Sequence, residues 1–248
     1  RSATEDIQAD FSMTAVSNDS SDNPIEAQLQ AIRQQIPDYV RLIAVTKKFS
    51  PEVIRTAYQA GLRDFGESQV QEAAMKQAAL ADLQDITWHL IGHLQTNKVR
   101  KALDLFSWIH SVDSLKLAKR LDQIAAEKQV RPACCIQVKM VPDPPKYGFD
   151  LDNFWPVLSD LNQLENLHIV GLMTIPPLNL DAAATGEVFQ QAQCLAEEIN
   201  AAGYEHIHIH ELSMGMSGDY PLAIAAGSTM IRLGTKLFGA RPVRSPSK

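Results

Sequence analysis

The sequence has few cysteines, and the three that it has cannot form a disulfide framework. Cys134 and Cys135 are adjacent, which leaves only Cys194 as a partner for either of them. Small secreted domains that depend on disulfides instead carry an even set of spaced cysteines. We therefore expect reduced thiols and a cytoplasmic protein, with Cys134 and Cys135 as buried strand residues.

Three further absences exclude whole classes of protein. The apolar runs, such as residues 42–45, are far shorter than the ~20 residues that span a bilayer, so a transmembrane protein is not expected. No positively charged segment leads into an apolar one at the N-terminus, so no secretory signal is expected. Lys and Arg number 23 against 29 Asp and Glu, for a formal net charge of −6, and no long basic run is present. Nucleic acid is therefore not an expected partner.

What the sequence does have is enough apolar residues for one large core. Its length is 248 residues, 45% of them hydrophobic, which fits a single α/β barrel domain. Residues 1–24 are mostly polar and are expected to be a mobile leader, in part an expression remnant. From Ile25 apolar residues recur every three to four positions as far as Ile36, which predicts an amphipathic helix ended by Pro37. Residues 25–248 are taken as the folded domain.

Beyond this helix, short apolar runs alternate with helical stretches. Eight such runs are typical of strands buried on both faces, and they cover residues 40–46, 64–66, 87–92, 108–112, 133–139, 169–175, 208–214 and 230–234. Eight strand-and-helix units predict an eight-stranded parallel (β/α)8 barrel. The alternative is an open doubly wound sheet, but its Gly-x-Gly-x-x-Gly fingerprint is absent after the first strand.

In such a barrel the carboxyl ends of the strands face the ligand, and here they are polar. The first strand ends with Thr46, Lys47 and Lys48. Adjacent strand residues alternate faces, so we expect one of the two lysines to point into the barrel mouth and the other to be solvated. A lysine amine whose pKa is lowered by burial is the group that forms an imine with an aldehyde.

The last two strands end in residues suited to phosphate. Arg232 lies within the eighth strand, and Gly234 and Thr235 follow it at a position where barrels commonly bind phosphate. The seventh strand closes with a small, hydroxyl-bearing segment that holds Ser213 and Ser217 and leads into a predicted helix. Together with Lys47, these segments indicate a phosphorylated ligand.

Several of these segments resemble those of the pyridoxal phosphate homeostasis proteins. The likeness runs in order from about residue 25 to residue 241 and is carried by residues 44–47, 65–67, 88–98, 171–176, 212–217 and 225–241. It implies a single barrel similar to the N-terminal domain of alanine racemase and a role in vitamin B6 and amino-acid homeostasis. One departure is Ser68, where many relatives carry Asn after the Gly-Glu pair.

The resemblance also implies a cofactor and its site. Pyridoxal 5′-phosphate would be held as an internal imine on Lys47, with Arg232 facing the pyridine nitrogen. Ser217, Gly234 and Thr235 would hold the phosphate with help from Ser213. No metal is implied, and the expected partners are this cofactor and the apoenzymes that accept it. His89 in the third strand is either a ligand of the cofactor or a hydrogen-bonded core residue, and Lys146 is a loop lysine near the mouth.

These residues favour a carrier or regulator over a catalyst. A guanidinium at the pyridine nitrogen disfavours protonation of that nitrogen, so the ring is a weak electron sink. Alanine racemase takes its second base, a tyrosine, from an additional domain that is expected to be missing here, and a monomer follows as the default. The first alternative is a weak amino-acid racemase that uses Lys47 as one base and a tyrosine or water as the other, with Tyr147 and Tyr220 in loops that reach the mouth. The second is a phosphosugar barrel enzyme without cofactor.

Overall fold

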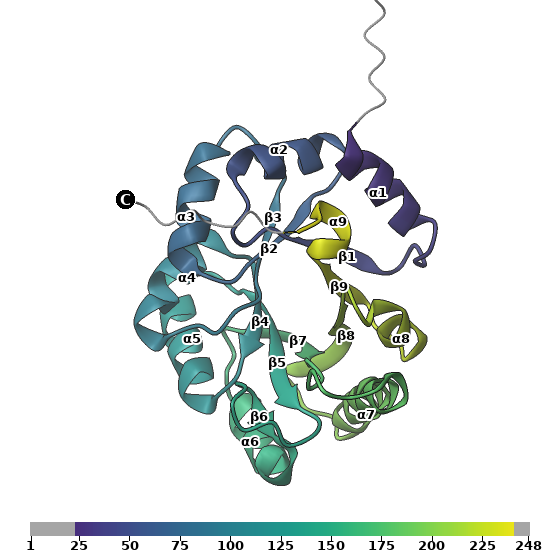
Figure 1. The fold of residues 1–248 in the computed structure, drawn as a ribbon. Coiled ribbons are helices and arrows are strands. Elements are labelled where there is room, and N and C mark those ends of the chain that lie inside the picture. Colours follow the sequence, from purple (N-terminus) through teal and green to yellow (C-terminus); the bar gives the residue numbers. More distant parts are fainter. Residues whose placement is uncertain (1–22, 241–248) are drawn as a thin grey trace, which may run out of the picture.

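The computed structural model describes residues 23–240, which form a closed parallel barrel (Figure 1). Each strand pairs with its neighbours in parallel, and the pairing of β4 with β5 closes the ring. The barrel strands are β1 (Arg41–Val45), β2 (Asp64–Glu67), β3 (Thr87–Leu90), β4 (Trp108–Val112), β5 (Ala133–Lys139), β7 (His168–Met173), β8 (Ile207–Met216) and β9 (Met230–Leu233). A further short strand, β6 (Phe149–Asp150), pairs with β5 outside the ring. The predicted eight-stranded barrel is confirmed.

Helices surround the strands (Figure 1). They are α1 (Pro24–Arg33), α2 (Pro51–Gln59), α3 (Val70–Ala79), α4 (Val99–Leu105), α5 (Leu115–Lys128), α6 (Phe154–Leu161), α7 (Ala182–Ala201), α8 (Tyr220–Ala225) and α9 (Thr235–Phe238), with 3₁₀ turns η1 (Thr96–Lys98) and η2 (Leu151–Asn153). Within residues 23–240 no helix is both long and apolar enough to cross a membrane.

The first helix begins earlier than the predicted boundary at residue 25. Asn23 is its N-cap, and the Asn23 side chain accepts a hydrogen bond from the Ile25 amide at 3.1 Å. Pro24 stands at the first helical position, where a proline costs no hydrogen bond. The leader was predicted to end at residue 24; residues 1–22, and with them its predicted mobility, lie outside the described residues.

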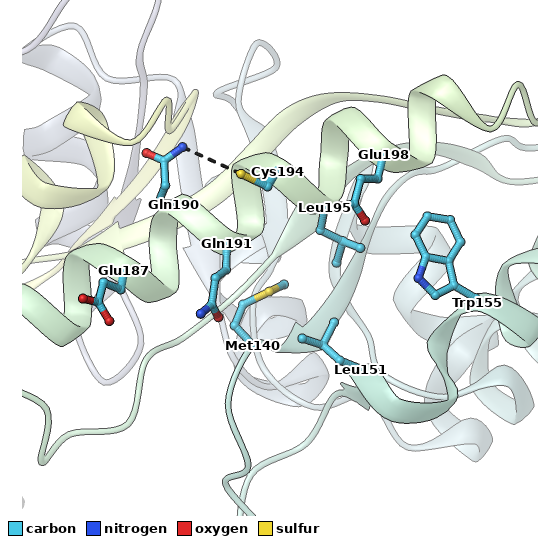
Figure 2. A pocket seen from close by; sticks show the side chains of 9 residues that line it. All are labelled: Met140, Leu151, Trp155, Glu187, Gln190, Gln191, Cys194, Leu195 and Glu198. Atoms are coloured by element: carbon cyan, nitrogen blue, oxygen red, sulfur yellow. Dashed lines mark hydrogen bonds between the residues drawn. The ribbon is translucent and has the colours of Figure 1, made fainter.

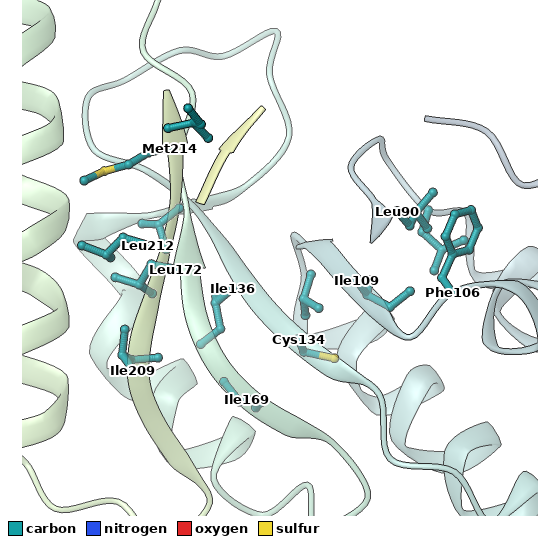
Figure 3. Close-up of a cluster of buried hydrophobic side chains, with 14 of the residues drawn as sticks. Leu90, Phe106, Ile109, Cys134, Ile136, Ile169, Leu172, Ile209, Leu212 and Met214 are labelled. Carbon is teal, nitrogen blue, oxygen red and sulfur yellow. The ribbon is translucent and has the colours of Figure 1, made fainter. Parts of the chain in front are cut away.

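The apolar core has an outer and an inner part. A large cluster fills the space between strands and helices, and Figure 3 shows side chains of it from β3, β4, β5, β7 and β8. The inner cluster is small and consists of Ile43, Cys135, Met173 and Met230. Cys134 belongs to the outer cluster and Cys135 to the inner one, because successive strand residues face opposite sides. Both are buried free thiols, as predicted, and burial raises the pKa of Cys134 to about 12.

The long helix α7 offers a simple test of local stability. Asp181 caps it, and its side chain accepts a hydrogen bond from the Ala184 amide at 2.8 Å. Asp181→Ala is expected to lower the free energy of unfolding by about 1 kcal/mol. Chemical denaturation measures this. Gln69 is the matched control, since it precedes α3 as N-cap without a side-chain bond, and an equal loss in Gln69→Ala would contradict the role of the Asp181 carboxylate.

Candidate functional site

Three neighbouring strands bring the predicted site residues together at the carboxyl end of the barrel. In the pairing of β1 with β9, Ile43 lies beside Arg232 and Ala44 beside Leu233. In the pairing of β8 with β9, Met216 lies beside Arg232. The residues that follow these strands are therefore neighbours, although Lys47 and Thr235 are far apart in the sequence.

Lys47 lies in a turn and not in a strand. Strand β1 ends at Val45, so the expected alternation of Lys47 and Lys48 along a strand is wrong. Lys47 is half-buried, while Lys48 is exposed and adopts a left-handed conformation with φ of 69°. The turn is braced by Phe49, whose ring packs 5.1 Å from that of Phe238 in α9. The two lysines nevertheless differ as expected in their exposure, because the turn directs the Lys48 side chain to solvent.

A buried polar cluster from β2 and α3 anchors this turn. The Lys76 ammonium donates hydrogen bonds of 2.7 Å to the Thr46 carbonyl and to Glu67 Oε1. Thr46 Oγ1 donates to the same Glu67 oxygen at 2.6 Å. The peptide that precedes Lys47 is thus held by a lysine 30 residues away. Nothing in the local sequence around Lys47 indicates this cluster.

Glu72 extends the cluster to the far side of Lys47. Its carboxylate accepts from Lys76 Nζ at 2.7 Å and from the Lys48 amide at 2.5 Å. Glu67 has no exposed side-chain surface, and burial raises its pKa although its bonds to Lys76 and Thr46 act in the opposite direction. Glu67 Oε2 has no hydrogen-bond partner in the described structure. The backbone on both sides of Lys47 is therefore held by charged side chains, by the buried Lys76 at Thr46 and by the half-buried Glu72 at Lys48.

Arg232 is buried at the inner face of β9. Its Nη1 donates to the carbonyl and the hydroxyl oxygen of Ser213, both at 2.6 Å, and its Nη2 donates to the Thr174 carbonyl at 3.3 Å. Burial lowers the pKa of Arg232 to about 10. These bonds hold the guanidinium across the ends of β7, β8 and β9. Beside it, Thr174 Oγ1 is buried without a partner.

Ser213, for which the resemblance implies help in holding the phosphate, and His89 both lie deep inside the barrel. Ser213 is fully buried, and its hydroxyl bonds Arg232 and His110. His89 is fully buried, with one ring nitrogen 2.8 Å from Asp64 Oδ1 and the other 2.9 Å from His110 Nε2. Of the two interpretations of His89, the structure confirms the hydrogen-bonded core residue.

Ser217, Gly234 and Thr235 meet at the junction of β8 and β9. Ser217 Oγ accepts hydrogen bonds from the amide of Gly234 at 3.3 Å and of Lys236 at 3.2 Å. Thr235 is exposed and Ser217 is half-buried. The amides at the start of α9 therefore bind an oxygen atom, that of the Ser217 hydroxyl. The helix predicted after Ser217 is α8, which begins only at Tyr220.

The loop after β5 lies over the mouth. Tyr147 stacks on His93 with ring centroids 3.7 Å apart, and His93 is 2.5 Å from Asp113 Oδ2. Lys146 donates to the Pro176 carbonyl at 3.0 Å, which ties this loop to the residues after β7.

The loops that follow β2 and β3 also lie close together. Ser68 follows β2, and its carbonyl oxygen would lie only 2.4 Å from a Cβ at position 92, so this approach requires a glycine at position 92.

Two other features carry no comparable chemistry. A groove of about 490 Å³ lies between α7 and the segment of Met140, Leu151 and Trp155, on the outside of the barrel (Figure 2). Its lining is mostly apolar and amide side chains, with Cys194 exposed on α7. In the described part of the chain, no three His, Cys, Asp or Glu side chains are grouped so that they could hold a metal ion.

Known proteins are similar to this chain over most of its length. Residues 22–242 match the family described as alanine racemase, N-terminal domain. The chain is 50% identical over 206 residues to the pyridoxal phosphate homeostasis protein of Synechocystis sp., covering 83% of this chain and 94% of that protein. It is 40% identical over 211 residues to the protein of the same name from Pseudomonas aeruginosa, covering 85% and 89%.

Two solved structures are also similar to this chain, one in sequence and fold and the other in fold alone. The structure of PipY from Synechococcus elongatus with PLP bound is 51% identical, covers 87% of this chain and all of that one, and superposes with a TM-score of 0.83. An alanine racemase from Corynebacterium glutamicum shares the fold with a TM-score of 0.66 at 17% identity, covering 90% of this chain and 62% of that one.

Proposed function

This chain belongs to the pyridoxal phosphate homeostasis protein family, and we propose that it holds pyridoxal 5′-phosphate reversibly at the carboxyl end of its barrel, covalently on Lys47. The observation that carries this site is the convergence of Lys47, Arg232 and Ser217 from three adjacent strands. When bound, the cofactor supplies an aldehyde that an amine can attack, a ring nitrogen and a phosphate. Each has a suitable group in this mouth.

The residues present fit these three groups. Thr174 Oγ1 is buried without a partner beside Arg232, so a polar atom of a ligand would satisfy it. The amides that bond Ser217 Oγ lie at the start of a helix, a position that suits phosphate oxygens. We assign the phosphate to Ser217, Gly234 and Thr235. We assign Ser213 to the support of Arg232, because its hydroxyl bonds His110 and Arg232 inside the barrel.

The protein acts as a carrier or regulator of the cofactor and not as an enzyme. Its curated relatives are named for pyridoxal phosphate homeostasis. Arg232 at the ring nitrogen would keep that nitrogen unprotonated, which weakens the ring as an electron sink. The tyrosines considered for a racemase are engaged: Tyr220 lies buried in α8 with its hydroxyl 3.0 Å from Gln35 Oε1, and not in a loop as predicted, while Tyr147 stacks on His93.

Absorption spectroscopy tests the proposed function directly. Cofactor-free protein titrated with pyridoxal 5′-phosphate is expected to gain a visible band. Reduction with borohydride should then fix the cofactor, and peptide mapping should locate it on Lys47. Absence of a band and of a reduced adduct would overturn the proposed binding. An adduct on Lys48 or Lys146 would overturn the assignment of Lys47.

Loaded protein is expected to exchange no appreciable Cα hydrogen of amino acids. A racemase needs an acid and a base on opposite faces of Cα, each within hydrogen-bond reach. Incubation of loaded protein with L-alanine in D₂O, followed by mass spectrometry and chiral chromatography, measures exchange and D-isomer. Rapid exchange that is lost in Tyr147→Phe would instead establish a racemase.

We propose a cytoplasmic, monomeric protein that passes the cofactor to apoenzymes. The three free cysteines, two of them buried, support a reducing compartment. Light scattering after size-exclusion chromatography should give the mass of one chain, and a stable dimer mass would contradict the monomer.

A further inference from the structure

A continuous row of hydrogen bonds runs through the barrel interior from its amino-terminal end to Arg232. Asp64 at the start of β2 accepts from His89 of β3 at 2.8 Å, and His89 Nδ1 is 2.9 Å from His110 Nε2 in β4. His110 Nδ1 is 2.7 Å from Ser213 Oγ in β8, and Ser213 Oγ is 2.6 Å from Arg232 Nη1. We call these five side chains the interior relay.

The direction of every bond in the interior relay follows from its two ends. A guanidinium only donates, so Ser213 Oγ accepts from Arg232 and its single O–H is left for His110 Nδ1. With that O–H donated, His110 Nδ1 is unprotonated, so the proton of His110 is on Nε2 and is donated to His89 Nδ1. The Asp64 carboxylate requires the same direction from the other end, because it only accepts. His89 in turn carries its proton on Nε2 and donates it to Asp64. In this arrangement every hydrogen-bond donor of the relay faces an acceptor.

Burial makes this arrangement demanding. His89, His110 and Ser213 have no exposed surface, and Arg232 is 4% exposed. Burial lowers the pKa of both histidines, well below the usual range for His110, so both rings are neutral. At His89 the hydrogen bond and charge of Asp64 act against burial and raise the pKa, while Arg41 lowers it and Glu211 raises it. At His110 the neighbouring His89, Arg232 and Arg41 all lower the pKa further. Two neutral rings therefore separate a cation from an anion.

The opposite direction of these hydrogen bonds would suit the two histidines, but it would cost a hydrogen bond at Ser213 or Arg232. If both rings carried their proton on Nδ1, His110 would donate to Ser213 Oγ. The Ser213 O–H would then need another acceptor, yet its described partners are a histidine and a guanidinium. One buried donor would be unpaired or one Arg232 bond would be lost. The Asp64 carboxylate prevents the reversal, because it can only accept from His89.

Asp64 occupies a different setting from the other members of the relay. Its side chain is 24% exposed, and its Oδ1 is 4.0 Å from Arg41 Nε. It lines a cavity of about 280 Å³ at the amino-terminal end of the barrel, together with Arg41 and Asp38. The carboxylate thus borders solvent at one end of the barrel, while Arg232 borders the mouth at the other.

We propose that Asp64, from the opposite end of the barrel, is a positioning residue for the cofactor: through the interior relay it sets the histidine tautomers that hold the Arg232 guanidinium in place. This inference rests on the proposed function, since it assumes that Arg232 meets the pyridine ring. It explains why two neutral histidines and a serine are buried in a row inside the barrel. It also assigns a role to a carboxylate that the cofactor never touches.

Nitrogen-15 NMR of the histidine rings in cofactor-free protein tests the relay without any ligand. Wild-type protein is expected to show His89 and His110 neutral and protonated on Nε2. A cationic ring or an Nδ1-protonated ring at either position would overturn the inference. This readout stands even if the protein proves not to bind pyridoxal phosphate, so the two failures are distinguishable.

Substitution at Asp64 tests the effect on the cofactor. Asp64→Ala is expected to weaken binding of pyridoxal phosphate by roughly fivefold or more and to shift its visible band. Asp64→Asn, whose amide oxygen still accepts from His89, should recover most of both. Asp38→Ala is the matched control, because Asp38 lines the same cavity without bonding a histidine. Wild-type affinity, spectrum and ring tautomers in Asp64→Ala would overturn the proposal; should that variant not fold, the wild-type tautomers and Asp64→Asn decide it.

Discussion

Replacement of Lys47 by alanine is expected to abolish covalent attachment of pyridoxal phosphate and leave the barrel folded. Lys47 is the half-buried lysine of the turn after β1, a strand whose Ala44 lies beside Leu233 of β9. The turn itself is held through the Thr46 carbonyl and the Lys48 amide. Neither bond uses the Lys47 side chain, so circular dichroism and thermal unfolding should change little while the visible band and the borohydride adduct disappear.

The neighbouring lysine is a close control for this experiment. Lys48→Ala removes an exposed amine of the same turn at a residue with φ of 69°, and alanine meets the same backbone conformation as lysine there. It is expected to keep the band and the adduct. Lys47→Arg separates the covalent bond from charge, since a guanidinium stays cationic and forms no such adduct. A band of wild-type intensity in Lys47→Ala would refute the assignment.

The fold follows from the sequence because its signals are local and repeated. Strands buried on both faces appear as continuous apolar runs, and strand β4 was predicted at its observed limits, 108–112. The first strand was predicted to extend beyond Val45, because Thr46 and Lys47 follow it without a break in the pattern. What ends it is the bonding of Lys76 and Glu72, which come from α3. Contacts of that kind are invisible in the residues around the turn.

The candidate site likewise contains residues that the sequence predicts and residues that it does not. Lys47, Ser217, Arg232, Gly234 and Thr235 are predicted as site residues because they stand at or next to strand ends, where parallel barrels place their ligands. The interior relay was not found, since it depends on the register of β2, β3, β4 and β8 and on which residues face inward. One signal was present: His89 and His110 both interrupt apolar strands. A polar residue in a strand buried on both faces needs a partner inside the barrel.

The second large effect is expected at Lys76. Lys76→Met is expected to lower the free energy of unfolding by about 3–5 kcal/mol, because it leaves the Glu67 carboxylate buried without its cation. The Lys76 side chain is 5% exposed and that of Glu67 is not exposed, so water cannot replace the lost bond. Chemical denaturation measures the loss. Lys128→Met, which removes the partner of Asp104 at the surface, should cost about 1 kcal/mol or less.

The pH dependence of this loss identifies the buried carboxylate as its cause. Burial raises the pKa of Glu67 in the folded protein above its ordinary value, and removal of Lys76 deletes the largest opposing contribution. A carboxyl with a raised folded pKa binds more protons folded than unfolded, so its penalty is greatest above that pKa and fades as the pH falls through it. The deficit of Lys76→Met should therefore shrink toward acid pH. The double variant Lys76→Met with Glu67→Gln should regain most of the stability at neutral pH, and a deficit independent of both pH and Glu67 would show that lost packing around the lysine, and not the buried charge, is responsible.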